Sequence, residues 1–385
     1  MLFDHNLPTL NPTAALLVAL LLIFTASRPA AAEVTLRLMT WVGYAPDSQV
    51  QEFERRMSEK YDEKVTLKVH YINGYDEAFR LLRSGEADIT VLVDHILHDG
   101  RYQFIANKLI IPIDLEAVPN YADVHEDYKP YVKHNCEVYA VPIASGPYGL
   151  AYNTRYFDSP PTTWNILWDP KYRGKYAITD GIFEVNLYIT ALAMGYPRED
   201  LGRFDRLNTP EFKARLRTLV ENAESFWPGI DEAHHLQGLH LAASWGFSIP
   251  GLRALGEEWK MAEPEEGSPT WIDVHAVNQS LSNKPLMKAL AFEWINYTLS
   301  PEFQLDVIVE GIATPPVTTS ALARLSEAQR QSYHLGDKEF IKKYRVIYPT
   351  IKLERNRNGI KYLWNQAKRG IDKPVRSKPV ATDMR

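Results

Sequence analysis

Residues 87–93 read Ala-Asp-Ile-Thr-Val-Leu-Val, a short apolar run that ends directly before Asp94 and His95. A run of this length predicts a strand that is buried on both faces, as in a parallel sheet. The upstream residues extend the pattern with strands at 34–39 and 64–72 and helices at 49–61 and 75–84. Strand, helix, strand, helix, strand is the order of an α/β layer, which is therefore the predicted fold class.

In such a layer, ligands bind beyond the carboxyl ends of the strands. Asp94 and His95 follow one predicted strand at that end, and Thr40-Trp41-Val42-Gly43-Tyr44 follows another. The side chains of Trp41, Tyr44, Asp94 and His95 are therefore candidates for contact with a ligand.

The rest of the chain predicts a second α/β region. Strands are expected at 137–141, 149–152 and 175–179, and helices at 184–194, 209–224, 283–299, 301–309 and about 358–368. The Pro- and Gly-rich residues 142–147 are expected to form a loop that crosses into the second domain. Residues 260–271 are acidic and loop-like, and residues 371–385 are expected to be disordered.

The composition is that of an ordinary globular protein with a mild acidic excess. The 385 residues, enough for two domains, are 45% hydrophobic and 24% charged, with a formal net charge of −5. This charge argues against nucleic acid as a partner. Cys136 is the only cysteine, so no internal disulfide can form.

No nucleophile elbow, phosphate-binding loop or zinc motif is present in the sequence. His234, His235 and His240 form the one metal-like grouping, but their spacing does not suit a single helix face. No cofactor and no metal are expected, and no catalytic residue is assigned.

The N-terminus predicts an export signal. Residues 14–24 form an apolar run of signal-peptide length, and Ala30-Ala31-Ala32 before Glu33 matches a cleavage site. We therefore expect residues 1–32 to be removed after Ala32 and the mature protein to be periplasmic. No later run reaches the 18 apolar residues of a transmembrane helix.

Trp271-Ile272-Asp273 is the stretch with the clearest binding chemistry. In an extended segment, Trp271 and Asp273 point to the same side. An indole face and a carboxylate together suit an organic cation, because the ring supplies cation–π attraction and the acid supplies the countercharge. The alternative is a strand with a core tryptophan and a surface aspartate.

Several separated stretches, in this order, resemble one family over about residues 36–370. They are 40–44, 87–91, 139–142, 149–153, 164–168, 171–175, 179–180 with 184, 245–246, 271–273, 289–299 and 314–315. The set resembles the bacterial extracellular solute-binding proteins of ABC importers, in their polyamine (spermidine/putrescine)-binding branch.

The resemblance implies a two-lobed periplasmic binding protein of type II-like architecture, with hinged lobes and a ligand cleft between them. Lobe 1 is expected to comprise residues 33–143 and 273–317, and lobe 2 residues 144–272 and 318–370. The expected ligand is a polyamine or related organic cation. Its ammonium groups need carboxylates and its methylenes need aromatic walls.

Carried over position by position, the resemblance implies a set of ligand-binding residues. The set comprises Trp41, Tyr44, Asp94, His95, Asp180, Glu184, Trp245, Trp271 and Asp273. The sequence departs from the family pattern at Gly181, where a second carboxylate is usual, and at Ser145 and Ile312, where aromatics are usual. His95 replaces a tyrosine and could make binding pH-dependent.

Three functions fit these observations. The first is a monomeric periplasmic protein that delivers its ligand to a membrane permease. The second is a sensor subunit that reports polyamine status to a membrane signalling protein. The third, an enzyme on the same scaffold, has no motif in its favour.

Overall fold

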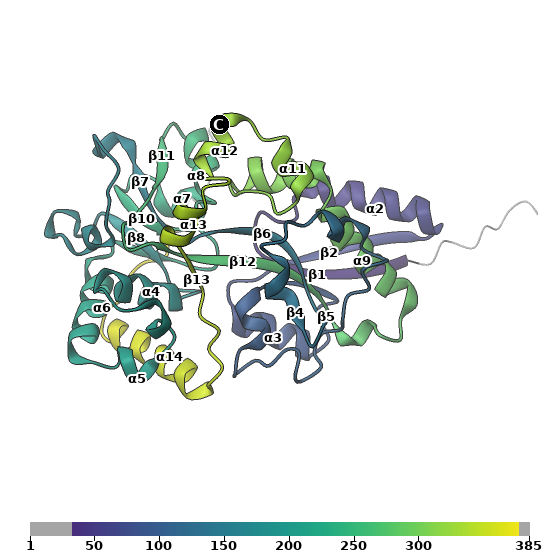
Figure 1. The fold of residues 1–385 in the computed structure, drawn as a ribbon, viewed down its shortest axis with the longest axis horizontal. Coiled ribbons are helices and arrows are strands. Elements are labelled where there is room, and N and C mark those ends of the chain that lie inside the picture. The colour runs from purple at the N-terminus through teal and green to yellow at the C-terminus, as the bar shows by residue number, and fades with distance from the viewer. Residues whose placement is uncertain (1–32, 377–385) are drawn as a thin grey trace, which may run out of the picture.

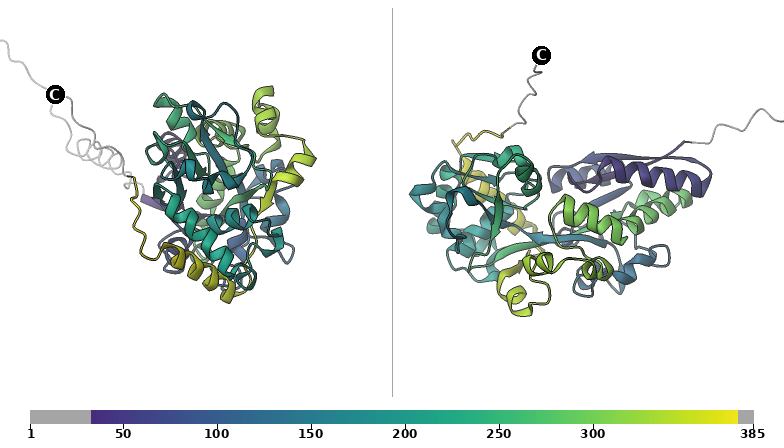
Figure 2. Two further views of the ribbon diagram at one scale, coloured as in Figure 1. Left: turned by 90° about the vertical axis from the view of Figure 1, so that its left-hand side faces the viewer. Right: turned by 90° about the horizontal axis from the view of Figure 1, so that it is seen from above.

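The computed structural model describes residues 33–376 as two α/β lobes joined by long strands (Figures 1 and 2). The expected signal peptide, residues 1–32, and residues 377–385 lie outside this described part. The predicted α/β class and two-lobed architecture are confirmed.

The first lobe is built on a sheet in the order β13-β12-β3-β1-β2, with β6 also paired to β12. Its strands are β1 (Glu33–Thr40), β2 (Lys64–Tyr71), β3 (Ile89–Val93), β6 (Val141–Pro147), β12 (Ser268–Val277) and β13 (Arg345–Ile347). All five residues of β3 are buried, as the apolar run predicts. β1 runs parallel to β2 and β3, so the carboxyl ends of these strands share one edge.

The second lobe is built on a sheet in the order β11-β7-β10-β8-β9. Its strands are β7 (Gly149–Asn153), β8 (Tyr176–Thr179), β9 (Ser225–Trp227), β10 (Leu241–Ser244) and β11 (Trp259–Ala262). A separate two-stranded ladder joins β4 (Lys133–His134) to β5 (Glu137–Val138).

Helices pack beside both sheets. Their bounds are α2 Asp47–Tyr61, α3 Tyr75–Arg83, α4 Glu184–Ala193, α5 Phe204–Leu207, α6 Pro210–Asn222, α7 Ala233–Leu236, α8 Ile249–Ala254, α9 Pro285–Thr298, α10 Pro301–Phe303, α11 Thr319–Ala323, α12 Glu327–Ser332, α13 Lys338–Tyr344 and α14 Glu354–Lys368. A 3₁₀ turn, η1, spans Asp94–His98, and a π-helix spans Gln304–Gly311. In Figure 1, α4, α5, α6 and α14 lie with the second lobe, whereas α2, α3 and α9 lie with the first.

The lobes are joined by β6 and β12, which pair in antiparallel fashion along their length (Figure 1). All ten residues of β12 are buried. The expected loop at 142–147 is therefore wrong, because these residues form β6. Gly146 serves close packing rather than a turn: a Cβ there would lie 2.9 Å from Cζ2 of Trp271. The expected lobe boundaries at 143/144 and 272/273 fall within these two strands, and the exact division of the chain stays a prediction.

Three other segments differ from the expectation. The acidic stretch 260–271 contains β11 and the start of β12, which leaves only a short connection between them. Residues 371–376 contact the second lobe, where the amide of Phe226 donates to the carbonyl of Pro374 over 3.0 Å. Helix α14 begins at Glu354, before the predicted start near Asn358, so Arg357 belongs to the helix.

Candidate ligand-binding pocket

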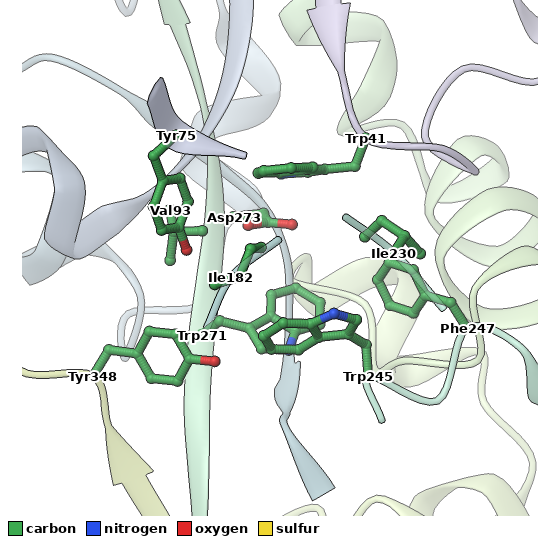
Figure 3. A pocket seen from close by; sticks show the side chains of 10 residues that line it. All are labelled: Trp41, Tyr75, Val93, Ile182, Ile230, Trp245, Phe247, Trp271, Asp273 and Tyr348. Atoms are coloured by element: carbon green, nitrogen blue, oxygen red, sulfur yellow. The ribbon is translucent and has the colours of Figure 1, made fainter. Parts of the chain in front are cut away.

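A pocket lies where the two lobes meet, and aromatic side chains form most of its wall (Figure 3). Its lining residues are Trp41, Tyr75, Val93, Ile182, Ile230, Trp245, Phe247, Trp271, Asp273 and Tyr348. Asp273 is the one acidic or basic side chain among them. The first lobe contributes residues at strand and helix ends, the connecting strand β12 contributes Trp271 and Asp273 from its interior, and the second lobe contributes loop residues.

Trp271 and Asp273 both line the pocket from β12, as the alternation of a strand predicts. The Trp271 ring meets Phe247 edge-on, with ring centroids 5.7 Å apart, and meets Trp245 at 6.4 Å. Both Trp271 and Asp273 are almost fully buried. The pairing of indole and carboxylate therefore faces one enclosed space.

Asp273 is a buried acid without a cation from the protein. The hydroxyl of Tyr44 donates a hydrogen bond to its carboxylate over 2.6 Å. Within residues 33–376, no Lys, Arg or His side chain forms an ion pair with it. Burial raises the pKa of Asp273 to about 8, the Tyr44 hydrogen bond opposes this rise, and the charge of Asp94 adds to it. A cation in the pocket would favour the charged carboxylate.

Asp94 and His95 lie in η1, directly after β3, and do not belong to the pocket lining. Burial raises the pKa of Asp94 to about 7, against the backbone amides of His95 and Ile272. The His95 ring packs between Tyr75 and Tyr348, with centroids at 5.8 and 5.1 Å. Burial and then Arg357 lower the pKa of His95 well below its usual value, which disfavours the charged imidazolium.

Trp41 and Trp245 approach the pocket from different lobes. Trp41 follows β1 and packs edge-on against Tyr75 at 6.1 Å. Trp245 follows β10, and its indole nitrogen donates to the carbonyl of Gly229 over 3.2 Å. Figure 3 shows Trp41 on one side of Asp273 and Trp245 with Trp271 on the other. Ring faces around one carboxylate form a site suited to an organic cation.

Glu184 and Asp180 are held by basic residues of helix α14 and do not line the pocket. Glu184, the first residue of α4, accepts a hydrogen bond from the Arg357 guanidinium. Asp180 accepts from Nζ of Lys368 over 2.6 Å and from the indole nitrogen of Trp364 over 2.9 Å. The structure thus gives these two acids partners within the protein.

Comparison with known proteins agrees with this geometry. Residues 87–344 match the family described as bacterial extracellular solute-binding protein. The chain belongs to this family of solute-binding proteins.

Relatives of this solute-binding protein include two that are named for polyamines. The spermidine/putrescine-binding periplasmic protein of Escherichia coli is 24% identical over 307 residues, 76% of this chain and 80% of the relative. The norspermidine sensor of Vibrio cholerae is 24% identical over 277 residues, 70% of this chain and 72% of the relative. A spermidine/putrescine ABC transporter substrate-binding protein of Streptococcus pneumoniae shares the fold, with a TM-score of 0.65 at 18% identity over 87% of this chain and 98% of that one.

The solute-binding protein departs from the expected family pattern for packing reasons. A Cβ at Gly181 would lie 2.5 Å from the amide nitrogen of Gly229 and 2.6 Å from the carbonyl of Asn73, so no side chain fits there. The Ser145 hydroxyl donates to the carbonyl of Trp271 over 2.7 Å, which braces β12 behind the pocket. The Ile312 side chain lies against Gly43, where a Cβ would approach it to 2.8 Å.

Sequence reasoning missed several pocket residues and one buried base. Tyr75, the first residue of α3, lies at the strand-end edge where a ligand residue is expected. Phe247 stands two residues after Trp245 and could have been inferred from that neighbourhood. No local signal marks Tyr348. Arg357 lies three residues before Ile360 on the buried face of α14. An arginine on the apolar face of a predicted helix could have indicated this buried base.

Between residues 33 and 376, no group of His, Cys, Asp or Glu side chains could hold a metal ion. No helix in the same range has the length and apolar character needed to cross a membrane.

Proposed function

We propose that this solute-binding protein captures a polyamine or a related organic cation in the periplasm and presents it to an ABC permease. The observation that supports this most is Asp273, a buried carboxylate among aromatic rings with no cation from the described protein. A buried unpaired acid is costly, and an ammonium ligand would supply its partner. The names of the E. coli and S. pneumoniae relatives support the same ligand class.

The proposal assigns roles to the predicted residues. Asp273 binds the ammonium, with Tyr44 orienting its carboxylate and Asp94 modulating its charge. Trp41, Trp245 and Trp271 enclose the methylenes. We further propose that residues 1–32 direct export, that the protein acts as a monomer, and that it binds its ligand without catalysis.

Titration with putrescine, spermidine, norspermidine and agmatine tests the proposal. Binding should change tryptophan fluorescence, because three tryptophans line the pocket. A ligand present at a hundred times its Kd should stabilise the protein by about 2.7 kcal/mol. If neither these amines nor a monocationic amine changed fluorescence or melting temperature, the proposal would fail.

A sensor role is the second candidate, and the V. cholerae norspermidine sensor supports it. In that case the bound protein would contact a membrane signalling protein instead of a permease. Neighbouring genes distinguish the two, because a transporter operon encodes permease and ATPase subunits. Co-purification of the ligand-bound protein with either membrane partner gives the direct test.

A further inference from the structure

Two groups of acids near the pocket, Glu184 with Asp99 and Asp273 with Asp94, differ because only the first has a cation from the described protein. Arg357 is buried, and all of its guanidinium nitrogens bond to carboxylates. Nε and Nη2 donate to Oδ2 of Asp99 over 3.1 and 2.5 Å, and Nη1 donates to Oε1 of Glu184. Although burial opposes the charge, Glu184 and Asp99 help to hold the pKa of Arg357 above its usual value. The guanidinium thus occupies the position that a ligand ammonium would need at Glu184.

The polar atoms near this cluster are uncharged. The hydroxyls of Tyr75, Tyr188 and Tyr348 and Nδ1 of His95 are buried and have no hydrogen-bond partner within residues 33–376. The rings of Tyr188 and Tyr348 are 5.8 Å apart. The His95 ring lies between the rings of Tyr75 and Tyr348, so these three side chains adjoin one another.

Figure 3 shows Tyr75 and Tyr348 on one side of the pocket, with Phe247 and Ile230 on the opposite side. Phenol hydroxyls donate and accept hydrogen bonds, and they suit a hydroxyl or carbonyl group. A second ammonium against this wall would lose its hydration without meeting Glu184 as a free carboxylate, because Glu184 is bonded to Arg357.

We propose that the pocket accepts one ammonium group, at Asp273, and an uncharged hydrogen-bonding group at Tyr75 and Tyr348, and that Arg357 sets this limit by occupying Glu184. The inference rests on the proposed function and narrows it. The ligand class is a monocationic amine with a hydroxyl or carbonyl end, and diamines are poorer ligands. Arg357 is a specificity-determining residue that acts through Glu184 without touching the ligand.

Putrescine and 4-amino-1-butanol form the matched pair that tests this, because they differ only in one ammonium or hydroxyl end. Isothermal titration at pH 8 should show the amino alcohol binding about tenfold more tightly than the diamine to the full chain. Butylamine, which lacks the hydroxyl, should bind about fivefold more weakly than the amino alcohol.

The double variant Asp99→Asn with Arg357→Gln removes the cation from Glu184. The net formal charge of the cluster stays that of a single carboxylate, because one acid and one base are removed together. The double variant should bind putrescine about tenfold more tightly than the wild type does. Because this variant could fail to fold, Glu184→Gln provides a second test. In Glu184→Gln, the ratio of the affinities for 4-amino-1-butanol and putrescine should stay within about twofold of the wild-type ratio, because Glu184 binds no ligand ammonium.

The outcomes separate the two proposals. Tighter binding of putrescine than of 4-amino-1-butanol, with a selective loss of putrescine in Glu184→Gln, overturns the single-ammonium inference and leaves the proposed function intact. Absence of binding for every amine, including the polyamines, overturns both. The expected ranking with an unchanged ratio in Glu184→Gln supports both.

Discussion

Two groups of buried carboxylates, Asp99 with Glu184 and Asp94 with Asp273, differ in what neutralises them. Asp99 and Glu184 share the guanidinium of Arg357, which α14 carries between them. Asp273 and Asp94 have no such base in the described chain, and burial raises the pKa of each, to about 8 and about 7. Both groups are deeply buried. Burial alone therefore does not identify a ligand-binding acid, because a buried acid can already have its cation within the protein.

The two groups of acids also have different effects on stability and on binding. In the Arg357 cluster both carboxylates bond to one buried guanidinium, so removal of that cation should destabilise the lobes. A buried acid without a cation lowers the stability of the ligand-free protein. A cationic ligand removes this penalty when it binds, and the free energy recovered favours binding. The two groups should accordingly respond in opposite ways to removal of one member.

Arg357→Met should have the largest effect. It leaves Asp99 and Glu184 buried without a cation, so the free energy of unfolding should fall by about 3–5 kcal/mol. Urea denaturation measures this. Arg355→Met, exposed on the same helix, is the matched control and should change stability by less than about 0.5 kcal/mol. If Arg357→Met and Arg355→Met had the same free energy of unfolding, Arg357 would not be needed to stabilise the two buried acids.

Asp273→Asn should act on binding instead. The loss of the only carboxylate in the pocket lining should weaken amine binding at least about a hundredfold, or about 2.7 kcal/mol. Calorimetry of the best amine measures this change. The ligand-free variant should melt above the wild type at pH 8, because an amide carries no charge that burial disfavours. Asp372→Asn, at an exposed acid, should alter neither property.

The pH dependence of binding should show the next effect. The empty-pocket pKa of Asp273 is raised to about 8, with Tyr44 and Asp94 as the facing groups. Below that pH, the carboxyl must lose a proton to pair with an ammonium. Affinity should therefore rise about tenfold per pH unit from pH 6 and level off near pH 8.

Asp94→Asn sharpens the pH test. It removes a charge that raises the pKa of Asp273, so the plateau should begin at a lower pH than in the wild type. Affinity that is flat from pH 6 to 8 in both proteins would contradict the protonation of Asp273. Fluorescence titration across this range provides the measurement.

Tyr44→Phe should have the smallest effect. The phenol donates to Asp273 over 2.6 Å, and its loss should weaken amine binding about fivefold, or about 1 kcal/mol. Competition titration resolves a change of this size. Tyr71→Phe is the control, because its hydroxyl bonds the carbonyl of Ala45 and is partly exposed. A larger loss at Tyr71 than at Tyr44 would contradict the role of the phenol at the acid.

Much of the fold could be predicted because its signals are local. The apolar run Ile89–Val93 and the alternation in β1 and β2 mark strands without reference to distant residues. The strand β6 was missed because its Gly and Pro residues are typical of loops. In the structure, Gly146 instead allows the Trp271 ring to approach the backbone, a contact that no local pattern reveals.

The pocket residues also divide into those that a local pattern predicts and those that depend on distant residues. The shared face of Trp271 and Asp273 follows from strand periodicity, and both line the cavity. The partner of Glu184 could not be predicted from local pattern, because Arg357 lies 173 residues away in the chain. Asp99 is separated from Arg357 by 258 residues. Whether an acid is available to a ligand depends on bases that are distant in the sequence. The residues next to the acid in the sequence therefore do not show whether it is available.

The position of Asp273 on β12 also has a consequence for the kinetics of binding. The pairing between β6 and β12 shifts register between Asp273 and Val274, in the ribbon that joins the lobes. If the lobes rotate about this ribbon, Asp273 should move less than Trp245, which lies beyond it in the second lobe. We therefore expect substitutions at Asp273 to act mainly on the association rate of an amine, and substitutions at Trp245 to act mainly on its dissociation rate.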